Sequence, residues 1–137
     1  MMKNKTVLIT GGCGFIGHHV VEHILRKTNW DIVILDKLSY ASMGYERLRS
    51  FDALDNSRVK VFSTDITLPI TEGLRKEIGD VDVIVHMAAE SHVDNSISEP
   101  REFFRNNIGG TVEMLEYAKT LPNLEMFFYF STDEVYG

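Results

Sequence analysis

A glycine-rich turn directly after a short apolar run is the feature that most constrains how this chain can fold. The run is "TVLIT" at 6–10, and the overlapping turn reads "TGGCGFIG", with Gly11, Gly14 and Gly17 at every third position. A tight turn needs residues that can take positive φ, and backbone amides approach an anion closely only where no Cβ intervenes. The pattern therefore predicts a strand, a turn and a helix whose N-terminus binds a pyrophosphate.

Four further apolar runs follow, with helical or polar stretches between them. They are "DIVILD" at 31–36, "VKVFS" at 59–63, "VDVIVH" at 81–86 and "LEMFFYF" at 124–130. Continuous apolar strands that alternate with helices are typical of a parallel sheet covered on both faces. We therefore predict an α/β fold, a Rossmann-type doubly wound parallel sheet with strand order 3-2-1-4-5.

Two amphipathic segments are expected to form the longer helices, one at about 15–28 and one at about 100–120. Weaker patterns at 43–54 and 68–79 predict two short helices. The helix at 100–120 carries an apolar stripe that is expected to face the sheet, formed by Phe104, Ile108, Val112 and Leu115. Neither a repeat nor an internal linker interrupts the pattern, so residues 1–137 are expected to form one domain.

Charge and cysteine content limit the classes of partner. The net charge is -6, from 20 acidic and 14 basic residues, without a basic cluster, so neither nucleic acid nor an anionic membrane is expected to bind. The single cysteine, Cys13, excludes an internal disulfide and is too little for a cysteine zinc site, so no metal is expected. It indicates a reducing, cytoplasmic setting. The first apolar run is too short to span a membrane.

Acidic residues at the ends of the second and third predicted strands indicate a dinucleotide. Asp36 ends the second strand 19 positions after Gly17, where a carboxylate accepts hydrogen bonds from the ribose hydroxyls and repels a 2'-phosphate. This favours NAD over NADP; the weaker alternative is that Asp36 merely caps the following loop. Asp65 and Ile66 come after the third strand, where one would offer an acceptor and the other an apolar wall to adenine.

Several motifs along the chain together resemble the extended short-chain dehydrogenase/reductase family, whose NAD-dependent epimerases and dehydratases act on nucleotide sugars. The similarity is greatest to its dTDP-glucose or UDP-glucose 4,6-dehydratases and runs from residue 6 to residue 137. The motifs are "TGGCGFIG", "DI" at 65–66, "HMAAESHVD" at 86–94, "NNIGGT" at 106–111 and "STDEVYG" at 131–137.

The resemblance implies a role for individual residues. Beside Asp36, Asp65 and Ile66, the NAD-binding residues that it implies are Gly11, Gly14, Phe15, Ile16, Gly17, Ala88 and Ala89. Ser91 and His92 would face the hexose or its diphosphate, or else form hydrogen bonds within their own loop. Asn107 would act one step away, by holding a helix and the neighbouring strand in register.

The resemblance also implies a reaction on an NDP-glucose. Hydride transfer from the sugar C4 to NAD would give a 4-keto sugar, water would be eliminated across C5 and C6, and the hydride would return to C6. Thr132 would position the C4 oxygen, Asp133 would act as the acid and Glu134 as the base. Burial and mutual repulsion can separate the pKa values of two adjacent carboxyl groups as this division requires. The less favoured alternative is a pair of solvated loop carboxylates, because open parallel sheets bind ligands at the carboxyl ends of their strands.

One part of the family's catalytic apparatus is missing from the chain. The family's hydride step uses a tyrosine with a lysine four positions later, and none of the five tyrosines has a lysine there. We therefore expect the N-terminal, NAD-binding part of a dehydratase, truncated before the later strands and the substrate domain and inactive as it stands. A nucleotide-sugar 4-epimerase and a non-catalytic NAD-sensing module remain as alternatives. Relatives usually dimerise through helices beside the sheet, so a homodimer is expected for the complete protein.

Overall fold

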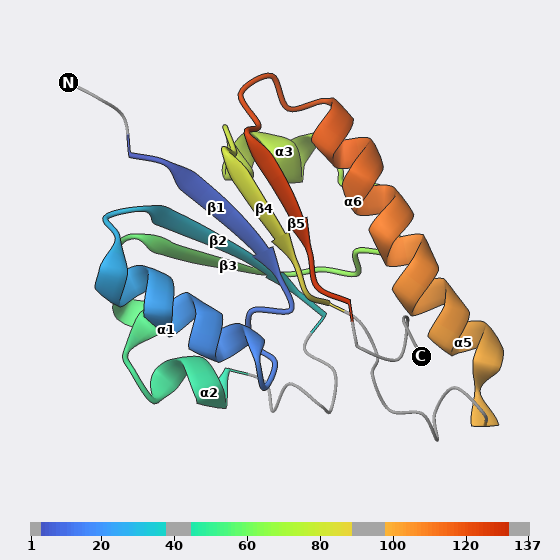
Figure 1. The fold of residues 1–137 in the computed structure, drawn as a ribbon, viewed down its shortest axis with the longest axis horizontal. Helices are drawn as coiled ribbons and strands as arrows, with labels where there is room; N and C mark the ends of the chain where they lie inside the picture. Colours follow the sequence, from blue (N-terminus) through green and yellow to red (C-terminus); the bar gives the residue numbers. More distant parts are fainter. Residues whose placement is uncertain (1–3, 38–44, 89–97, 132–137) are drawn as a thin grey trace.

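The computed structural model describes residues 4–37, 45–88 and 98–131 and contains one five-stranded parallel sheet. Its strand order is β3-β2-β1-β4-β5, as the sequence predicts (Figure 1). The strands are β1 Thr6–Thr10, β2 Asp31–Asp36, β3 Val59–Ser63, β4 Val83–His86 and β5 Met126–Tyr129. The first three have the predicted bounds, whereas β4 and β5 are shorter than the apolar runs that contain them.

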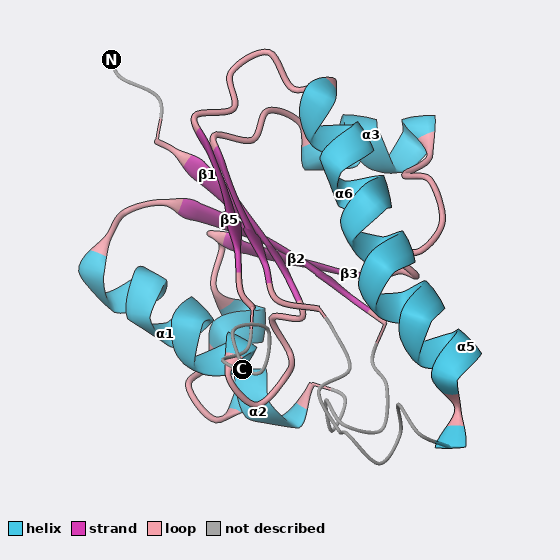
Figure 2. Cartoon of the chain, turned by 45° about the vertical axis from the view of Figure 1, so that its right-hand side comes forward, coloured by secondary structure: helices cyan, strands magenta, loops and turns pink. Residues whose placement is uncertain are grey.

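Helices cover both faces of the sheet. Figure 2 shows α1 and α2 on one side and α3, α5 and α6 on the other. The helical elements are α1 Gly17–Lys27, α2 Glu46–Arg49, η2 Ala53–Asp55, α3 Glu72–Ile78, α5 Pro100–Phe104, η3 Arg105–Gly109 and α6 Gly110–Lys119. Each predicted helical segment therefore contains a helix, and the one at 100–120 is continuous but has π-helical geometry in its middle.

The alternate residues of the central strands form two separate cores. Val7, Ile9 and Ile34 pack with Val21 of α1 on one face. On the other face, Leu8, Val33, Leu35 and Ile84 pack with Met114 and Tyr117 of α6. Every residue of β1 is buried, because this strand lies between β2 and β4 and is covered from both sides. This burial explains why the strand is apolar at consecutive rather than alternate positions.

The long helix presents a different face to the sheet from the one expected. Phe104, Ile108, Val112 and Leu115 are 62%, 48%, 49% and 45% exposed, so the prediction that this stripe faces inward is wrong. The buried residues of α6 are Gly110, Met114 and Tyr117. The segment carries two apolar stripes, and the π-helical turn η3 changes the register between its two halves, because each π-helical hydrogen bond spans five residues.

Arg58 fixes the C-terminal end of α1 relative to β2. Its Nη2 donates to the carbonyl of Leu25 at 2.6 Å, and its Nη1 donates to those of Thr28 and Trp30 at 2.7 and 3.2 Å. A guanidinium at this point satisfies carbonyls that the helix leaves unpaired and opposes the negative end of the helix dipole. The opposite end of α1 is thereby held towards the carboxyl edge of the sheet.

Across the described ranges, none of the helices is long and apolar enough to cross a membrane.

Candidate functional site

The predicted phosphate turn lies where β1 ends, at the centre of the sheet. Gly11 takes a φ of 75°, a conformation that residues with a side chain rarely adopt. Its amide donates to the carbonyl of Leu35 at 2.9 Å, and the amide of Gly14 donates to the carbonyl of Gly11 at 3.0 Å. The order of the strands reverses at β1, and open α/β sheets bind ligands at such a switch point.

Helix α1 begins against this turn at a distance that only glycine permits. A Cβ added at Gly17 would lie 2.0 Å from the carbonyl oxygen of Gly11, well inside van der Waals contact. The third glycine of the motif therefore serves the packing of the helix on the turn. The close approach directs the N-terminus of α1 at the space beside the turn.

The N-terminus of α1 is suited to an anion. Its N-cap residue, Ile16, makes no side-chain capping bond, and the first turn contains no acidic residue. Phe15 and Ile16 are 69% and 59% exposed, so both predicted cofactor-binding residues lie at the surface of this edge. An uncompensated helix N-terminus with positive dipole attracts a phosphate.

Asp36 is bonded to the glycine turn. It is 6% exposed, and its Oδ2 accepts a hydrogen bond from the amide of Cys13 at 3.0 Å. Burial, together with the neighbouring Asp36 carboxylate, raises the pKa of Cys13 to about 12. The thiol is therefore protonated at neutral pH and is no nucleophile. The structure thus brings together Asp36 and the glycine turn, which are far apart in the sequence.

Asp65 and Ile66 lie just beyond β3. Both the amide and the hydroxyl of Thr67 donate to Asp65 Oδ1, at 2.9 and 2.6 Å, and the hydroxyl holds the pKa of Asp65 below its usual value. Ile66 is 8% exposed, and its side chain packs in the core beneath α6. Asp65 is therefore ionised at neutral pH, and the side chain of Ile66 contributes little surface to this edge.

Ala88 lies directly beside the glycine turn. A Cβ at Gly11 would be 3.0 Å from the Cα of Ala88, so the two backbones are in close contact. The amide of Ala88 donates to Thr10 Oγ1 at 3.0 Å. The remaining predicted site residues lie outside the described residues, namely Ala89, Ser91, His92, Thr132, Asp133 and Glu134.

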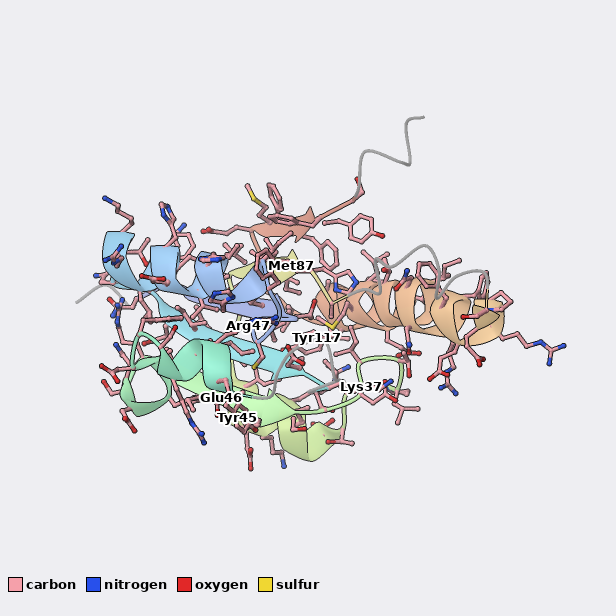
Figure 3. The ribbon with its side chains drawn as sticks, turned by 90° about the horizontal axis from the view of Figure 1, so that it is seen from below. Lys37, Tyr45, Glu46, Arg47, Met87 and Tyr117 are labelled. Carbon is pink, nitrogen blue, oxygen red and sulfur yellow. The ribbon has the colours of Figure 1, made fainter. Side chains whose placement is uncertain are left out.

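Arg47 of α2 is a neighbour of the glycine turn that the sequence motifs do not indicate. Its guanidinium lies 5.6 Å from the centre of the Phe15 ring, and its Nη1 forms a long hydrogen bond, 3.5 Å, to the carbonyl of Cys13. Figure 3 views the molecule from below and labels Arg47 together with Met87, the residue that directly follows β4. The arrangement places a cation beside the predicted phosphate turn.

A buried histidine is the second feature that the sequence interpretation missed. His86 is 1% exposed and ends β4 opposite Thr10, the last residue of β1. Its Nδ1 lies 2.7 Å from Thr10 Oγ1 and its Nε2 lies 3.0 Å from Thr111 Oγ1 of α6. Thr111 Oγ1 donates to the carbonyl of Asn107 at 2.7 Å. The signal available in the sequence was a polar residue at the end of each of two apolar strands.

The described residues therefore offer a surface for a dinucleotide. Within the same described residues, no group of three histidine, cysteine or carboxylate side chains is placed to hold a metal.

Comparison with known proteins identifies the family. The family model of GDP-mannose 4,6 dehydratase matches residues 8–137. The chain belongs to this family. A dTDP-glucose 4,6-dehydratase of Neisseria gonorrhoeae is 42% identical over an alignment of 147 residues that covers 97% of this chain and 40% of the relative. A trifunctional UDP-glucose 4,6-dehydratase of Arabidopsis thaliana is 41% identical over 140 residues, 98% of this chain and 20% of the relative.

Solved structures of the same fold include both dehydratases and epimerases. The dTDP-glucose 4,6-dehydratase DesIV of Streptomyces venezuelae, a double mutant with NAD bound, matches with a TM-score of 0.82 and 36% identity over 99% of this chain and 40% of its own. A UDP-N-acetylglucosamine 4-epimerase of Methanobrevibacter ruminantium matches with a TM-score of 0.81 and 29% identity. This match covers 99% of this chain and 40% of the epimerase chain. The chain thus spans about 40% of the length of these family structures.

The contact between Gly17 and the turn predicts a large penalty for a single methyl group. Gly17→Ala should lower the free energy of unfolding by about 3 kcal/mol or more, because α1 must move off the turn. Gly73→Ala is the matched control, since nothing lies within 4 Å of a Cβ at this helical position. It should raise stability by about 0.5–1 kcal/mol. Urea unfolding of both variants measures the difference, and equal midpoints would contradict the packing described.

The buried His86 predicts a loss of stability in mild acid. Burial lowers its pKa from 6.5 to about 4, so between these values the unfolded chain binds a proton that the folded chain does not. The His86 contribution to stability is therefore constant above about pH 6.5 and falls as the pH drops towards 4, by about 3 kcal/mol in all.

Denaturant unfolding at a series of pH values measures this loss. His86→Asn should reduce the slope of stability against pH between 6.5 and 4, and His23→Asn, which removes an exposed histidine of α1, should leave it as in the wild type. If the slope in His86→Asn equals that of the wild type, the loss of stability in acid does not come from His86.

Proposed function

We propose that residues 1–137 form the NAD-binding, N-terminal portion of an NAD-dependent nucleotide-sugar 4,6-dehydratase, a lyase of deoxysugar biosynthesis. The reaction converts an NDP-glucose into an NDP-4-keto-6-deoxyglucose. The observation that carries the proposal is membership of the family over residues 8–137, joined to 42% identity with a dTDP-glucose 4,6-dehydratase. The substrate domain and the tyrosine–lysine pair would belong to the part of the protein that follows.

The described geometry fits NAD. The turn at Gly11 and Gly14 would let the backbone lie close to the pyrophosphate, Gly17 would hold α1 against this turn, and the uncapped start of α1 would face the charge of the ligand. Asp36 would accept hydrogen bonds from the adenosine ribose, for which its position beside the turn is suitable. Family structures solved with NAD support the same cofactor. Bound NAD would supply reversible hydride acceptance, and the residues of the chain would bind and orient it.

The remaining roles follow from the family resemblance. Ser91 and His92 would contact the sugar nucleotide, and Thr132 would position the C4 oxygen of the hexose. Glu134 would remove the C5 proton and Asp133 would protonate the departing C6 hydroxyl, so that water leaves without a strong base or acid in solution. Two carboxyl groups are needed only when water is eliminated, which favours a dehydratase over an epimerase.

We also assign the complete protein to the cytoplasm as a homodimer. The free, buried Cys13 supports a reducing compartment, and cell fractionation tests it. The exposed stripe of the long helix supports the dimer, because contiguous apolar surface of this kind marks interaction sites. The mass of the complete protein in solution tests that assignment.

Cofactor choice provides a test that does not require turnover. We expect NAD to bind at least about ten-fold more tightly than NADP, because the Asp36 carboxylate repels a 2'-phosphate. Asp36→Asn should reduce the ratio of NAD affinity to NADP affinity. The asparagine can still accept the hydrogen bond from the Cys13 amide, but it carries no charge to repel the 2'-phosphate. Asp31→Asn, at the opposite end of β2, is the control and should leave the ratio unchanged. Titrations of both cofactors measure it, and tighter binding of NADP by the wild type would overturn the role of Asp36.

The reaction itself can be followed with the full-length protein in heavy water. A dehydratase should release a sugar nucleotide that has lost one water and gained deuterium at C5, because a solvent-exchanged proton is returned there. An epimerase would give an isomer without deuterium at C5, and a binding module would give neither. Mass spectrometry and proton NMR separate the three outcomes.

Glu134→Gln should abolish the loss of water if Glu134 is the base. Glu116→Gln, on the exposed side of α6, is the matched control and should keep the wild-type rate. Undiminished product from Glu134→Gln would remove this residue from the proposed role.

A further inference from the structure

A line of hydrogen bonds, buried at His86 and partly buried at the helix, joins the glycine turn to the long helix through His86. Four residues form it, Thr10 at the end of β1, His86 at the end of β4, and Thr111 and Asn107 on the helix. The family resemblance implies no role for His86, and only the fold brings its two threonine partners to opposite sides of one ring.

The partners of Thr10 decide the direction of the first bond. Thr10 Oγ1 accepts hydrogen bonds from the amides of Met87 and Ala88, both at 3.0 Å. A hydroxyl has two acceptor lone pairs and one proton, so the proton is left for the remaining neighbour. Thr10 therefore donates to His86 Nδ1, and this nitrogen carries no hydrogen.

The partners of Thr111 agree with this assignment from the other side of the ring. Thr111 Oγ1 uses its proton to bond the carbonyl of Asn107, so it can only accept from His86. His86 is therefore the neutral Nε2–H tautomer, which donates to Thr111 at 3.0 Å. The opposite tautomer would leave no proton between Nε2 and Thr111, or would break the bond of Thr111 to Asn107. That tautomer and a charged ring would both add a third donor to Thr10 Oγ1, which has only two lone pairs.

The surroundings of the ring keep this order fixed. The Tyr129 ring stacks on His86 at 5.6 Å with an angle of 18°, and Phe127 lies 6.1 Å away. Tyr129 is the titratable group of β5 that faces the histidine, while β1 and α6 face it with neutral threonine hydroxyls. Because the ring is only 1% exposed, water has little access to its two nitrogens, and loss of either ring bond would leave a poorly solvated polar atom.

The two ends of the line meet different parts of the candidate site. At one end, Thr10 holds the amide of Ala88 in close contact with Gly11. At the other end, Thr111 bonds the carbonyl of Asn107 within the π-helical segment η3. Threonines that bond a carbonyl four residues back bend helices, and single π-helical turns are frequent at functional sites.

We propose that His86 is a positioning residue whose neutral Nε2–H ring couples the floor of the cofactor site, at Gly11 and Ala88, to the π-helical turn at Asn107. A change at Thr111 is then transmitted through His86 and Thr10 to the cofactor site. The tautomer is independent of the proposed function, whereas the coupling rests on it, since it is measured as affinity for NAD.

The tautomer is tested by nitrogen NMR of the ring in the wild-type chain at neutral pH. Protonated and unprotonated ring nitrogens have well separated chemical shifts, so the expected result is an unprotonated Nδ1 and a protonated Nε2 for His86. A protonated Nδ1 would overturn the proposal whatever the chain binds. Thr10→Ser and Thr111→Ser keep both hydroxyls and should leave this pattern unchanged.

The coupling is tested by NAD titration of Thr111 variants. Thr111→Val removes the acceptor for His86 and should weaken NAD binding roughly three- to ten-fold, the range typical of residues that share one hydrogen-bond network. Thr111→Ser should restore wild-type affinity. In a His86→Phe background, Thr111→Val should have no further effect, because the line is already broken. A purely structural threonine would lower the midpoint of unfolding without changing the affinity of the folded protein.

Each failure has a separate meaning. If the wild type binds NAD and Thr111→Val binds it equally well while folded, the coupling is wrong and the cofactor assignment stands. If the wild type does not bind NAD, both the proposed function and the coupling are wrong. The nitrogen spectrum still decides whether His86 has the assigned tautomer. If Thr111→Val does not fold, the comparison of Thr111→Ser with Thr111→Ala, which also lacks the hydroxyl but adds no bulk, decides the coupling.

Discussion

The contact between Gly17 and the carbonyl of Gly11 is the constraint on which the candidate site depends. A Cβ at Gly17 would lie only 2.0 Å from that oxygen, so the start of α1 is packed directly on the turn that follows β1. The fully buried β1 supplies the base of this turn, and Arg58 secures the far end of the helix. The direction of the helix dipole is thus set by packing before any ligand is present.

Around this turn, buried polar groups connect segments that the sheet alone would leave independent. Asp36 reaches the turn from β2 through the amide of Cys13, and Thr10 reaches the residues after β4 through two further amides. A buried carboxylate or hydroxyl that satisfies backbone amides stabilises one arrangement of the loops over others, because any rearrangement leaves those amides unpaired. The carboxyl edge of the sheet is therefore organised by side-chain to backbone bonds rather than by apolar contacts.

The strands were predictable because a two-sided core requires continuous apolar runs, and β1, β2 and β3 have the bounds read from the sequence. The glycine turn was predictable for a similar reason, since its spacing reflects local steric limits. The inward face of the long helix was not predictable. It carries an apolar stripe on each side, and choosing between them requires knowledge of the π-helical turn and of the sheet. Arg47 was missed because its neighbour Phe15 is 32 positions away and the two meet only through the fold.

His86 shows most clearly which information a motif lacks. The motifs contain a histidine at the start of "HMAAESHVD" and a threonine before "GGCGFIG". These two residues are 76 positions apart, and their pairing depends on the register of β1 and β4. Once β1 and β4 are adjacent, Thr10 Oγ1 accepts from the amides of Met87 and Ala88, and His86 lies between the hydroxyls of Thr10 and Thr111. A neutral ring with one donor and one acceptor satisfies both sides, which neither lysine nor a carboxylate could do without burying a charge. The chemistry of the residue at this position is therefore selected by the topology of the sheet.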